Sequence, residues 1–128
     1  MKKKHIDFLM VRDKQETFFE TVGVFDNNQL TFIDHENQKN SILLKPNKVE
    51  YIKMGDQFMH YSFVENETTK GIYRVDQFEF IFQIQTTYLQ STKERLNINF
   101  TLQQDDEIIG HHQLTLVYKD DEEDLDGL

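Results

Sequence analysis

Apolar and polar residues alternate along most of the chain, and the alternation is clearest in its last third. Apolar side chains occupy every second position in three long runs, within residues 78–88, 96–103 and 113–118. Successive side chains of an extended strand point to opposite faces, so a period of two is typical of a strand with one buried face. Short polar segments separate the runs, which favours antiparallel neighbours joined by tight turns.

The first of these runs also predicts which side chains face the interior. Its alternation assigns to the interior Phe78, Phe80, Phe82, Ile84, Thr86 and Tyr88. The outer set is then Glu79, Gln83 and Gln85, with Ile81 as an apolar exception on the polar face. A register slip of one residue would exchange the two faces, so this assignment is a strict one.

Shorter segments with the same tendency fill the first two-thirds of the chain. They lie at residues 6–11, 18–25, 29–33, 41–44, 49–54, 58–64 and 72–75. No segment has the 3.6-residue period of a helix. About ten strand candidates at this spacing are typical of a sandwich or barrel. We therefore expect an all-β fold, an antiparallel barrel of eight to ten strands in meander order.

Length and charge set the domain organisation. The chain has 128 residues, which fits one domain, and a net charge of −9. The last ten residues, 119–128, hold six acidic residues and one lysine, and so contribute −5 of that charge. We expect residues 1–119 to form a single barrel domain and residues 120–128 to form an acidic, disordered tail.

The same composition narrows the cellular setting and the partners. An acidic body repels a phosphate backbone and an anionic membrane, which argues against nucleic-acid and membrane binding. The chain has no cysteine, and no apolar stretch has the length of a signal-peptide core or a membrane span. We expect a cytoplasmic protein that is a monomer or a weak homodimer.

The order of features from Val49 onward resembles the YwiB-like proteins, an uncharacterised family of small bacterial proteins. The resemblance rests on VEYIKMGDQFMHYSFVENETTKGIYRV, then a long alternating strand, then RLNINFTL and HHQLTLVY. Gly55, Phe63 and Tyr73 stand where that pattern places them, whereas Phe78 stands where it tends to have glycine. The likeness covers residues 5–118 and implies a calycin-like β-barrel related in shape to lipocalins. It implies no activity.

Residues able to carry chemistry are few and scattered. Of the five histidines, His111 and His112 are adjacent and would point to opposite faces of a strand. His60 and His112 would meet only across the barrel, and their spacing matches no zinc pattern. The acidic clusters at residues 65–67 and 105–107 are typical of solvated loops. We predict no metal site, no cofactor and no catalytic residue.

The aromatic residues are the more informative set, with eleven phenylalanines and five tyrosines but no tryptophan. They either fill the barrel interior, which we favour, or line a cavity for an apolar ligand. Polar groups near the mouth of such a cavity would supply the specific contacts. The candidate ligand-binding residues are His60, Tyr61, Tyr73, Arg74, Phe82, Tyr88, His112 and Tyr118.

Three classes of function remain open at this point. The leading hypothesis is a non-catalytic binding module for a small apolar or amphipathic ligand. The second is a protein-interaction or regulatory module that uses an exposed strand edge, an apolar patch or the acidic tail. An enzyme is the weakest of the three. A continuous cavity lined by Phe78, Phe80, Phe82 and Tyr118 would favour the first hypothesis, and a solid core with a flat exposed apolar patch would favour the second.

Overall fold

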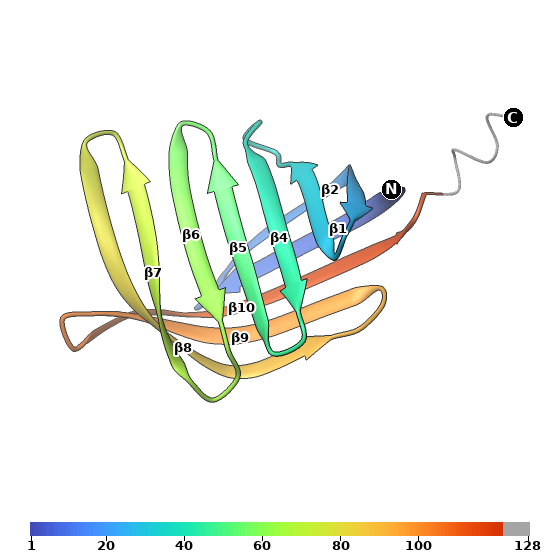
Figure 1. The fold of residues 1–128 in the computed structure, drawn as a ribbon. Coiled ribbons are helices and arrows are strands. Elements are labelled where there is room, and N and C mark those ends of the chain that lie inside the picture. Colours follow the sequence, from blue (N-terminus) through green and yellow to red (C-terminus); the bar gives the residue numbers. More distant parts are fainter. Residues whose placement is uncertain (122–128) are drawn as a thin grey trace, which may run out of the picture.

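The computed structural model describes residues 1–121, and residues 122–128 lie outside the described part. Ten antiparallel strands form one closed barrel, as the sequence predicts (Figure 1). The strands are β1 (Lys2–Arg12), β2 (Gln15–Asp26), β3 (Gln29–Ile33), β4 (Lys39–Lys45), β5 (Lys48–Met54), β6 (Gln57–Phe63), β7 (Thr68–Val75), β8 (Phe78–Ser91), β9 (Arg95–Gln104) and β10 (Glu107–Asp120). Within residues 1–121, no helix is long and apolar enough to cross a membrane.

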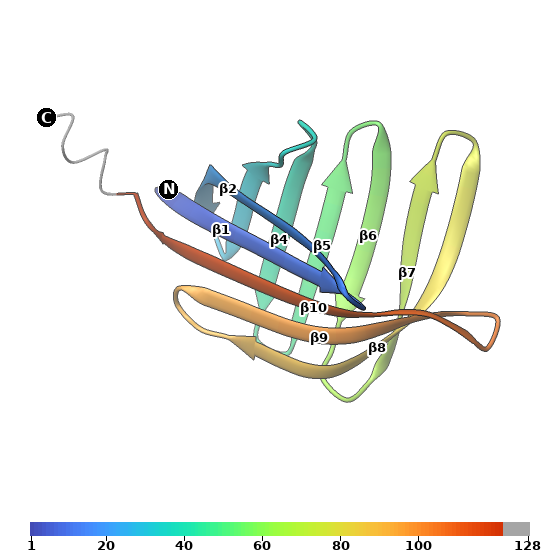
Figure 2. The ribbon, with the colours of Figure 1, turned by 180° about the vertical axis from the view of Figure 1, so that it is seen from behind.

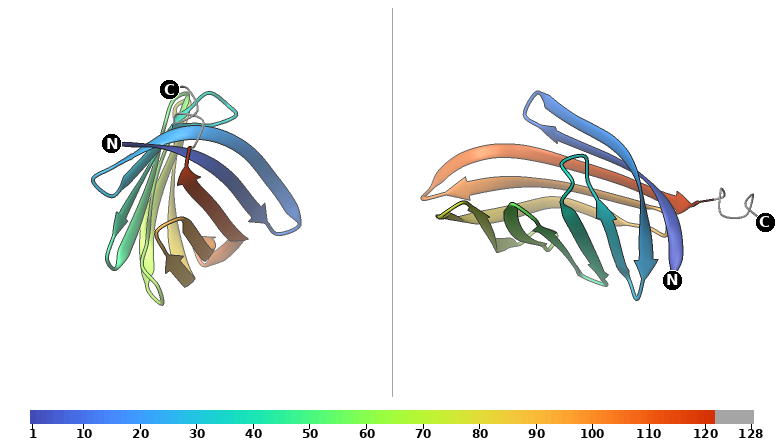
Figure 3. Two further views of the ribbon diagram at one scale, coloured as in Figure 1. Left: turned by 90° about the vertical axis from the view of Figure 1, so that its right-hand side faces the viewer. Right: turned by 90° about the horizontal axis from the view of Figure 1, so that it is seen from above.

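Each strand pairs with its neighbour in sequence, and β1 closes the barrel against β10. Figures 1 and 2 show that β3 to β7 form a wall of steep strands, while β1, β9 and β10 run across them. The 14-residue β8 bends from one wall into the other, and Figure 3 shows the elongated barrel that results. The pairing is the meander predicted from the short polar links.

Tight turns join consecutive strands, and asparagine and aspartate occupy the turn positions that have positive φ angles. Asn27 and Asn28, between β2 and β3, have φ values of 50° and 62°. Consecutive positive φ values fit the two-residue hairpin turn that matches the twist of the flanking strands. Asp105 and Asp106, between β9 and β10, have φ values of 49° and 65°. Short polar side chains tolerate this left-handed conformation, which explains these residue types in the turns.

The middle of the barrel is solid. Inward-facing side chains from all around the wall are fully buried there and form one apolar cluster. The predicted inner faces of residues 96–103 and 113–118 are confirmed by the burial of Leu96, Ile98, Phe100, Leu102, Leu114, Leu116 and Tyr118. The interior is therefore not one continuous cavity, and side chains fill its centre as the favoured alternative predicts.

The predicted faces of β8 hold in its centre and fail at both of its ends. Ile84 and Thr86 are buried, and Gln83 and Gln85 are exposed. Phe78 and Phe80, assigned to the interior, are 58% and 36% exposed, because they lie at the strand end that projects beyond the core. The pairing with β9 shifts between Thr86 and Tyr88. This bulge reverses the alternation, so that Tyr88, also assigned to the interior, is 43% exposed.

The last strand extends slightly past the predicted end of the domain. Asp120 is the final residue of β10, and its carboxylate accepts a 2.8 Å hydrogen bond from the Lys4 ammonium. The Asp121 backbone N–H donates to the Lys3 carbonyl oxygen at 3.1 Å. The first two residues of the predicted tail therefore belong to the seam between β1 and β10, and the rest of that tail lies outside the described residues.

We predict that the face assignment in β8 controls stability. Ile84→Ala should cost about 2–5 kcal/mol of unfolding free energy, because it removes buried surface and leaves a cavity. Gln83→Lys should change that free energy by less than about 0.5 kcal/mol, because the side chain is already exposed. Phe80→Ala should fall between the two. Urea unfolding of the three variants side by side makes the comparison, and a larger loss in Gln83→Lys than in Ile84→Ala would contradict the register.

We also predict different results for two shortened chains. A chain ending at Asp121 should keep the thermal midpoint of the full chain within a few degrees. A chain ending at Lys119 should melt at a lower temperature, because the buried Lys4 ammonium loses its carboxylate partner. Calorimetric melting of both chains makes the measurement, and equal midpoints would show that the Lys4–Asp120 pair does not support the seam.

Candidate functional site

A pocket of about 490 Å³ opens at the end of the barrel where β1 ends and β10 begins. The strands overhang the solid core at this end, so their inward side chains line a space instead of packing against each other. Most of the wall is apolar, formed by methionine, leucine, isoleucine and phenylalanine side chains. Its polar members are Arg12, Gln15, Thr17, Tyr51, Tyr61, Tyr73 and His112.

Aromatic rings follow one another from the rim of the pocket into the core. Neighbouring ring centroids in this series lie 4.7–6.4 Å apart, which is the usual range for aromatic pairs. The series, in order from the rim, is Tyr73, Phe80, Phe82, Tyr61, Phe63, Phe100 and His112. It gives the pocket a rigid apolar wall with polar atoms at intervals.

His112 ends this series. It is half-buried and stacked on Phe100 with ring centroids 4.8 Å apart. Burial lowers the pKa of His112, and the positive charge of Arg12 lowers it further. Asp13 and the Gly110 backbone favour the protonated ring but do not offset those effects. The ring is therefore neutral at pH 7. Its Nδ1 atom is buried and makes no hydrogen bond of acceptable geometry.

Arg12 is the cross-strand partner of His112 in the seam between β1 and β10. It is the last residue of β1, and its exposed side chain lines the mouth of the pocket. Among residues 1–121, no carboxylate lies within ion-pair distance of its guanidinium group. A guanidinium group presents a fork of N–H donors that matches a carboxylate or phosphate. Arg12 is thus the one cationic side chain in the wall of this pocket.

The tyrosines of the pocket differ in how their hydroxyl groups are used. Burial raises the pKa of Tyr61 and of Tyr73, so both hydroxyl groups stay neutral hydrogen-bond donors. The Tyr51 hydroxyl donates to the side-chain oxygen of Asn40, whose amide group donates to Asp34 at 2.9 Å. Tyr51 is therefore held by the protein itself, while Tyr61 and Tyr73 can turn their hydroxyl groups toward a ligand.

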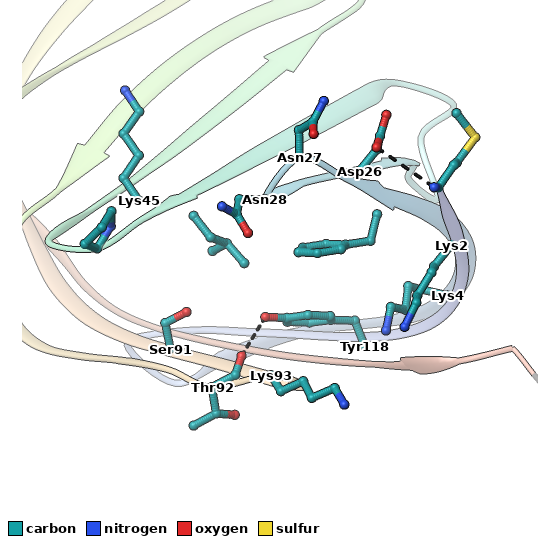
Figure 4. Close-up of a pocket in the computed structure, with 14 residues that line it drawn as sticks. Lys2, Lys4, Asp26, Asn27, Asn28, Lys45, Ser91, Thr92, Lys93 and Tyr118 are labelled. Carbon is teal, nitrogen blue, oxygen red and sulfur yellow. Dashed lines mark hydrogen bonds and ion pairs between the residues drawn. The ribbon is translucent and has the colours of Figure 1, made fainter.

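The structure brings together four of the eight residues nominated from the sequence. Tyr61, Tyr73, Phe82 and His112 share this pocket. Tyr118 lines a second pocket at the opposite end of the barrel, where its hydroxyl donates to the Thr92 carbonyl oxygen at 2.9 Å (Figure 4).

The other three nominated residues line neither pocket. The His60 Nε2 atom is 3.2 Å from a Glu50 carboxylate oxygen, so His60 does not meet His112 across the barrel. Arg74 donates to the Glu79 carboxylate at 2.6 Å. Tyr88 faces outward because of the bulge in β8. The positions of His60 and Arg74 follow from the alternation of their strands, because every second residue of a strand points out of the barrel.

Arg12 is a residue of this pocket that the sequence analysis did not nominate. It stands in a polar run, residues 12–15, which indicates only a turn. Its place beside His112 depends on the pairing of the first strand with the last, and no local pattern encodes that pairing. The alternation along β1 could have indicated it, because Arg12 continues the inward-facing series of Ile6, Phe8 and Met10.

One group on the outer face was also not anticipated. His5, Asp7 and Glu20 place one potential ligand atom each within 4.8 Å of one another. The His5 Nε2 atom is 3.2 Å from Asp7 and 3.8 Å from Glu20. The three side chains therefore lie close together on the outer face of β1 and β2.

Comparison with known proteins places the chain in a family. The profile of a domain of unknown function, DUF1934, matches residues 5–116. The chain belongs to the DUF1934 family. Among solved structures, this DUF1934 protein is similar to the ywiB protein from Bacillus subtilis, with a TM-score of 0.64 and 17% sequence identity. The match covers 93% of this chain and 90% of that chain.

At this identity the comparison shows the fold alone, and it confirms both the expected barrel and the resemblance to the YwiB-like proteins. No curated protein matches the chain. For this DUF1934 protein, the comparisons assign no role to the residues that line the pocket.

We predict that Arg12→Gln raises the pKa of His112 toward the ordinary histidine value near 6.5, because one of the two main causes of its depression disappears. Lys14→Gln removes the same charge from the adjacent turn and should leave this pKa nearly unchanged. NMR titration of the His112 ring in the three proteins makes the measurement. The same depressed pKa means that stability contributed by neutral His112 falls as pH drops from about 6.5 toward the folded-state pKa. An unchanged His112 pKa in Arg12→Gln would contradict the proximity of the two groups.

Proposed function

We propose that this protein is a non-catalytic binding module for a small amphipathic anion. The apolar part of the ligand lies against the aromatic wall of the pocket, and its carboxylate or similar group lies at the mouth beside Arg12. The observation that supports this most directly is the combination of an apolar pocket with one unpaired guanidinium group at its rim.

The dimensions of the pocket suit a small ligand. Ligand sites in proteins usually have volumes of about 300–1,000 Å³ and combine apolar walls with a few convergent polar groups. The pocket has a volume of about 490 Å³, with Arg12, Tyr61, Tyr73 and His112 as those groups. Because rings at fixed positions lose little freedom on binding, an aromatic wall favours binding at low entropic cost.

The charge of the pocket favours an anion over a neutral ligand. The chain carries a net charge of −9, yet Arg12 is the only charged side chain that residues 1–121 contribute to the lining of this pocket. The guanidinium group can form two parallel hydrogen bonds with a carboxylate. Neutral His112 and the two tyrosine hydroxyl groups can add further hydrogen bonds without adding charge.

The same lining supports binding rather than catalysis. No carboxylate among the described residues lines the pocket, so His112 has no acidic partner there to orient it as a general base. The lining also lacks serine, cysteine and lysine nucleophiles. An arginine, a neutral histidine and two neutral tyrosines together form a recognition surface for an anion.

A second candidate function is supported by exposed apolar side chains. Phe78 and Ile108 are 58% and 57% exposed and lie on the hairpins that join β7 to β8 and β9 to β10. Ile81 is exposed on the same side of β8 as its polar residues. Exposed apolar groups of this kind are typical of surfaces that bind another protein. This observation keeps a protein-interaction module as the alternative.

We predict that decanoate binds the pocket and that decanol binds more weakly. Arg12→Gln should weaken decanoate binding by about tenfold or more, because a hydrogen bond to a charged group contributes about 1.5–3 kcal/mol. The same variant should leave decanol binding nearly unchanged. Isothermal titration calorimetry of both ligands with both proteins makes the measurement, and Lys14→Gln is the matched control for net charge.

Two outcomes would count against this function. Absence of binding by both ligands would overturn the proposal, and equal weakening by Arg12→Gln and Lys14→Gln would exclude a specific role for Arg12. Native mass spectrometry of the protein purified from its own cells separates the two candidate functions. A bound mass of a few hundred daltons supports the ligand-binding module, and a bound protein supports the interaction module.

A further inference from the structure

A second pocket, of about 630 Å³, lies at the opposite end of the barrel. It is bordered by the start of β1 and the ends of β2, β4, β8 and β10, so no residue of the first pocket contributes to it. Its apolar floor includes Phe25 stacked on Tyr118, with ring centroids 6.0 Å apart. Figures 1 and 2 show that the N-terminus and the end of β10 meet at this end of the barrel.

Cationic groups gather at this mouth although the protein as a whole is acidic. Lys2, Lys4, Lys45 and Lys93 line the pocket together with the α-amino group of Met1. Figure 4 shows Lys2 and Lys4 side by side at the right of the pocket and Lys93 below Tyr118, whereas Lys45 extends away from the pocket. Lys45 forms an ion pair with Glu50 at 2.7 Å, and the α-amino group lies 4.0 Å from Asp26.

Lys4 is the buried member of this group. It is 4% exposed, and its ammonium donates to Asp120 at 2.8 Å and lies 5.8 Å from the centre of the Phe25 ring. An ammonium group has three N–H donors. Among residues 1–121 the structure shows one hydrogen bond to this group, so two donors remain for a ligand. A buried, preorganised cation of this kind is a common element of anion sites.

The charges around Asp120 do not balance within the described residues. The hydrogen bond and charge of Lys4 lower the pKa of Asp120, and the nearby charges of Lys2 and Lys93 lower it further. Among residues 1–121, the ion pairs at this mouth join Lys4 to Asp120, Lys45 to Glu50 and the α-amino group of Met1 to Asp26. Lys2 and Lys93 form no ion pair with any residue in 1–121. Two positive charges therefore have no ion-pair partner in the described part of the chain.

We propose that this mouth binds the phosphate group of a small phosphorylated compound, with Lys2, Lys4 and Lys93 as the cationic ligands and the Phe25–Tyr118 floor beside the non-phosphate part. A phosphate dianion matches the two unmatched charges. The side-chain amides of Asn27 and Asn28 at the rim provide neutral groups for additional hydrogen bonds. The volume of about 630 Å³ suits a ligand of metabolite size.

The remainder of the surface explains why the ligand is small. The net charge of −9 repels an extended polyanion or an anionic membrane beyond the mouth itself. A small phosphorylated compound meets only the local positive field. This site stands independently of the function proposed for the first pocket, since the two share no residue.

Isothermal titration calorimetry of the full chain with inorganic pyrophosphate tests the site. We expect saturable binding of one pyrophosphate per chain that weakens as salt concentration rises. The double variant Lys2→Gln, Lys93→Gln should bind about tenfold more weakly, and because both side chains are exposed it should fold normally. The matched control is Lys14→Gln, Lys70→Gln, which removes the same charge from exposed positions elsewhere.

If the control variant bound pyrophosphate as weakly as Lys2→Gln, Lys93→Gln, the loss would be an effect of net charge and the proposed site would be wrong. Absence of saturable pyrophosphate binding to the full chain would also overturn the site. A parallel arm uses vesicles of phosphatidylglycerol as the other source of phosphate groups. Binding to vesicles without binding to pyrophosphate would overturn the assignment of a small soluble ligand. Amide NMR shifts on adding pyrophosphate should be centred on residues 25–28 and 91–93, and shifts centred on the first pocket would contradict the proposal.

Discussion

The hydrogen-bonded pairing of β1 with β10 is the constraint on which the rest of the structure depends. It closes the barrel, and its register runs from Lys4 opposite Asp120 to Arg12 opposite His112. Each end of this pairing places a cationic side chain at one mouth of the barrel. The buried Lys4 is held at one end, and Arg12 is held beside His112 at the other. A single register therefore determines the polar chemistry of both pockets.

The relation between strand length and core size explains why the pockets are at the ends. β8 and β10 each have 14 residues, whereas β3 has five. Side chains such as Ile84, Ile98 and Leu116 fill the centre, where all walls contribute and a small barrel has no spare volume. Toward the ends the long strands overhang the core, and their inward residues are left to line open space.

Much of this fold could be predicted from the sequence because burial imposes a period of two on each strand. The interior positions of Leu96, Ile98 and Phe100 follow from alternation alone. Two features of β8 could not be predicted from its own residues. The bulge after Thr86 reverses the phase of Tyr88, and no residue type in that segment signals an extra residue. Exposure of Phe80 depends on where the core ends, which only the other strands determine.

The candidate sites depended even more on long-range pairing. Tyr61, Tyr73, Phe82 and His112 could be nominated because aromatic and histidine side chains suit a cavity wall. Arg12 and Lys4 could not be nominated, because their place in a pocket depends on pairing with β10. Their partners in β10 are far away in the sequence, and the Lys4–Asp120 pair is separated by 116 positions. From the sequence alone, the basic residues 2–4 and the polar residues 12–15 are typical of solvated surface. Only the pairing of β1 with β10 places Lys4 and Arg12 at the pockets.

The pairing of the first strand with the last also determines when folding can finish during synthesis. β1 is translated before the other nine strands of the barrel and its partner β10 after them, so one edge of β1 has no partner while the intervening strands are translated. An unpaired edge invites pairing with another chain, and the lysines at the start of β1 oppose this through their charge. Closure joins residues at the largest separation in the fold, which makes it slow compared with hairpin formation. Closure of the barrel is therefore also the step that creates both of its ends.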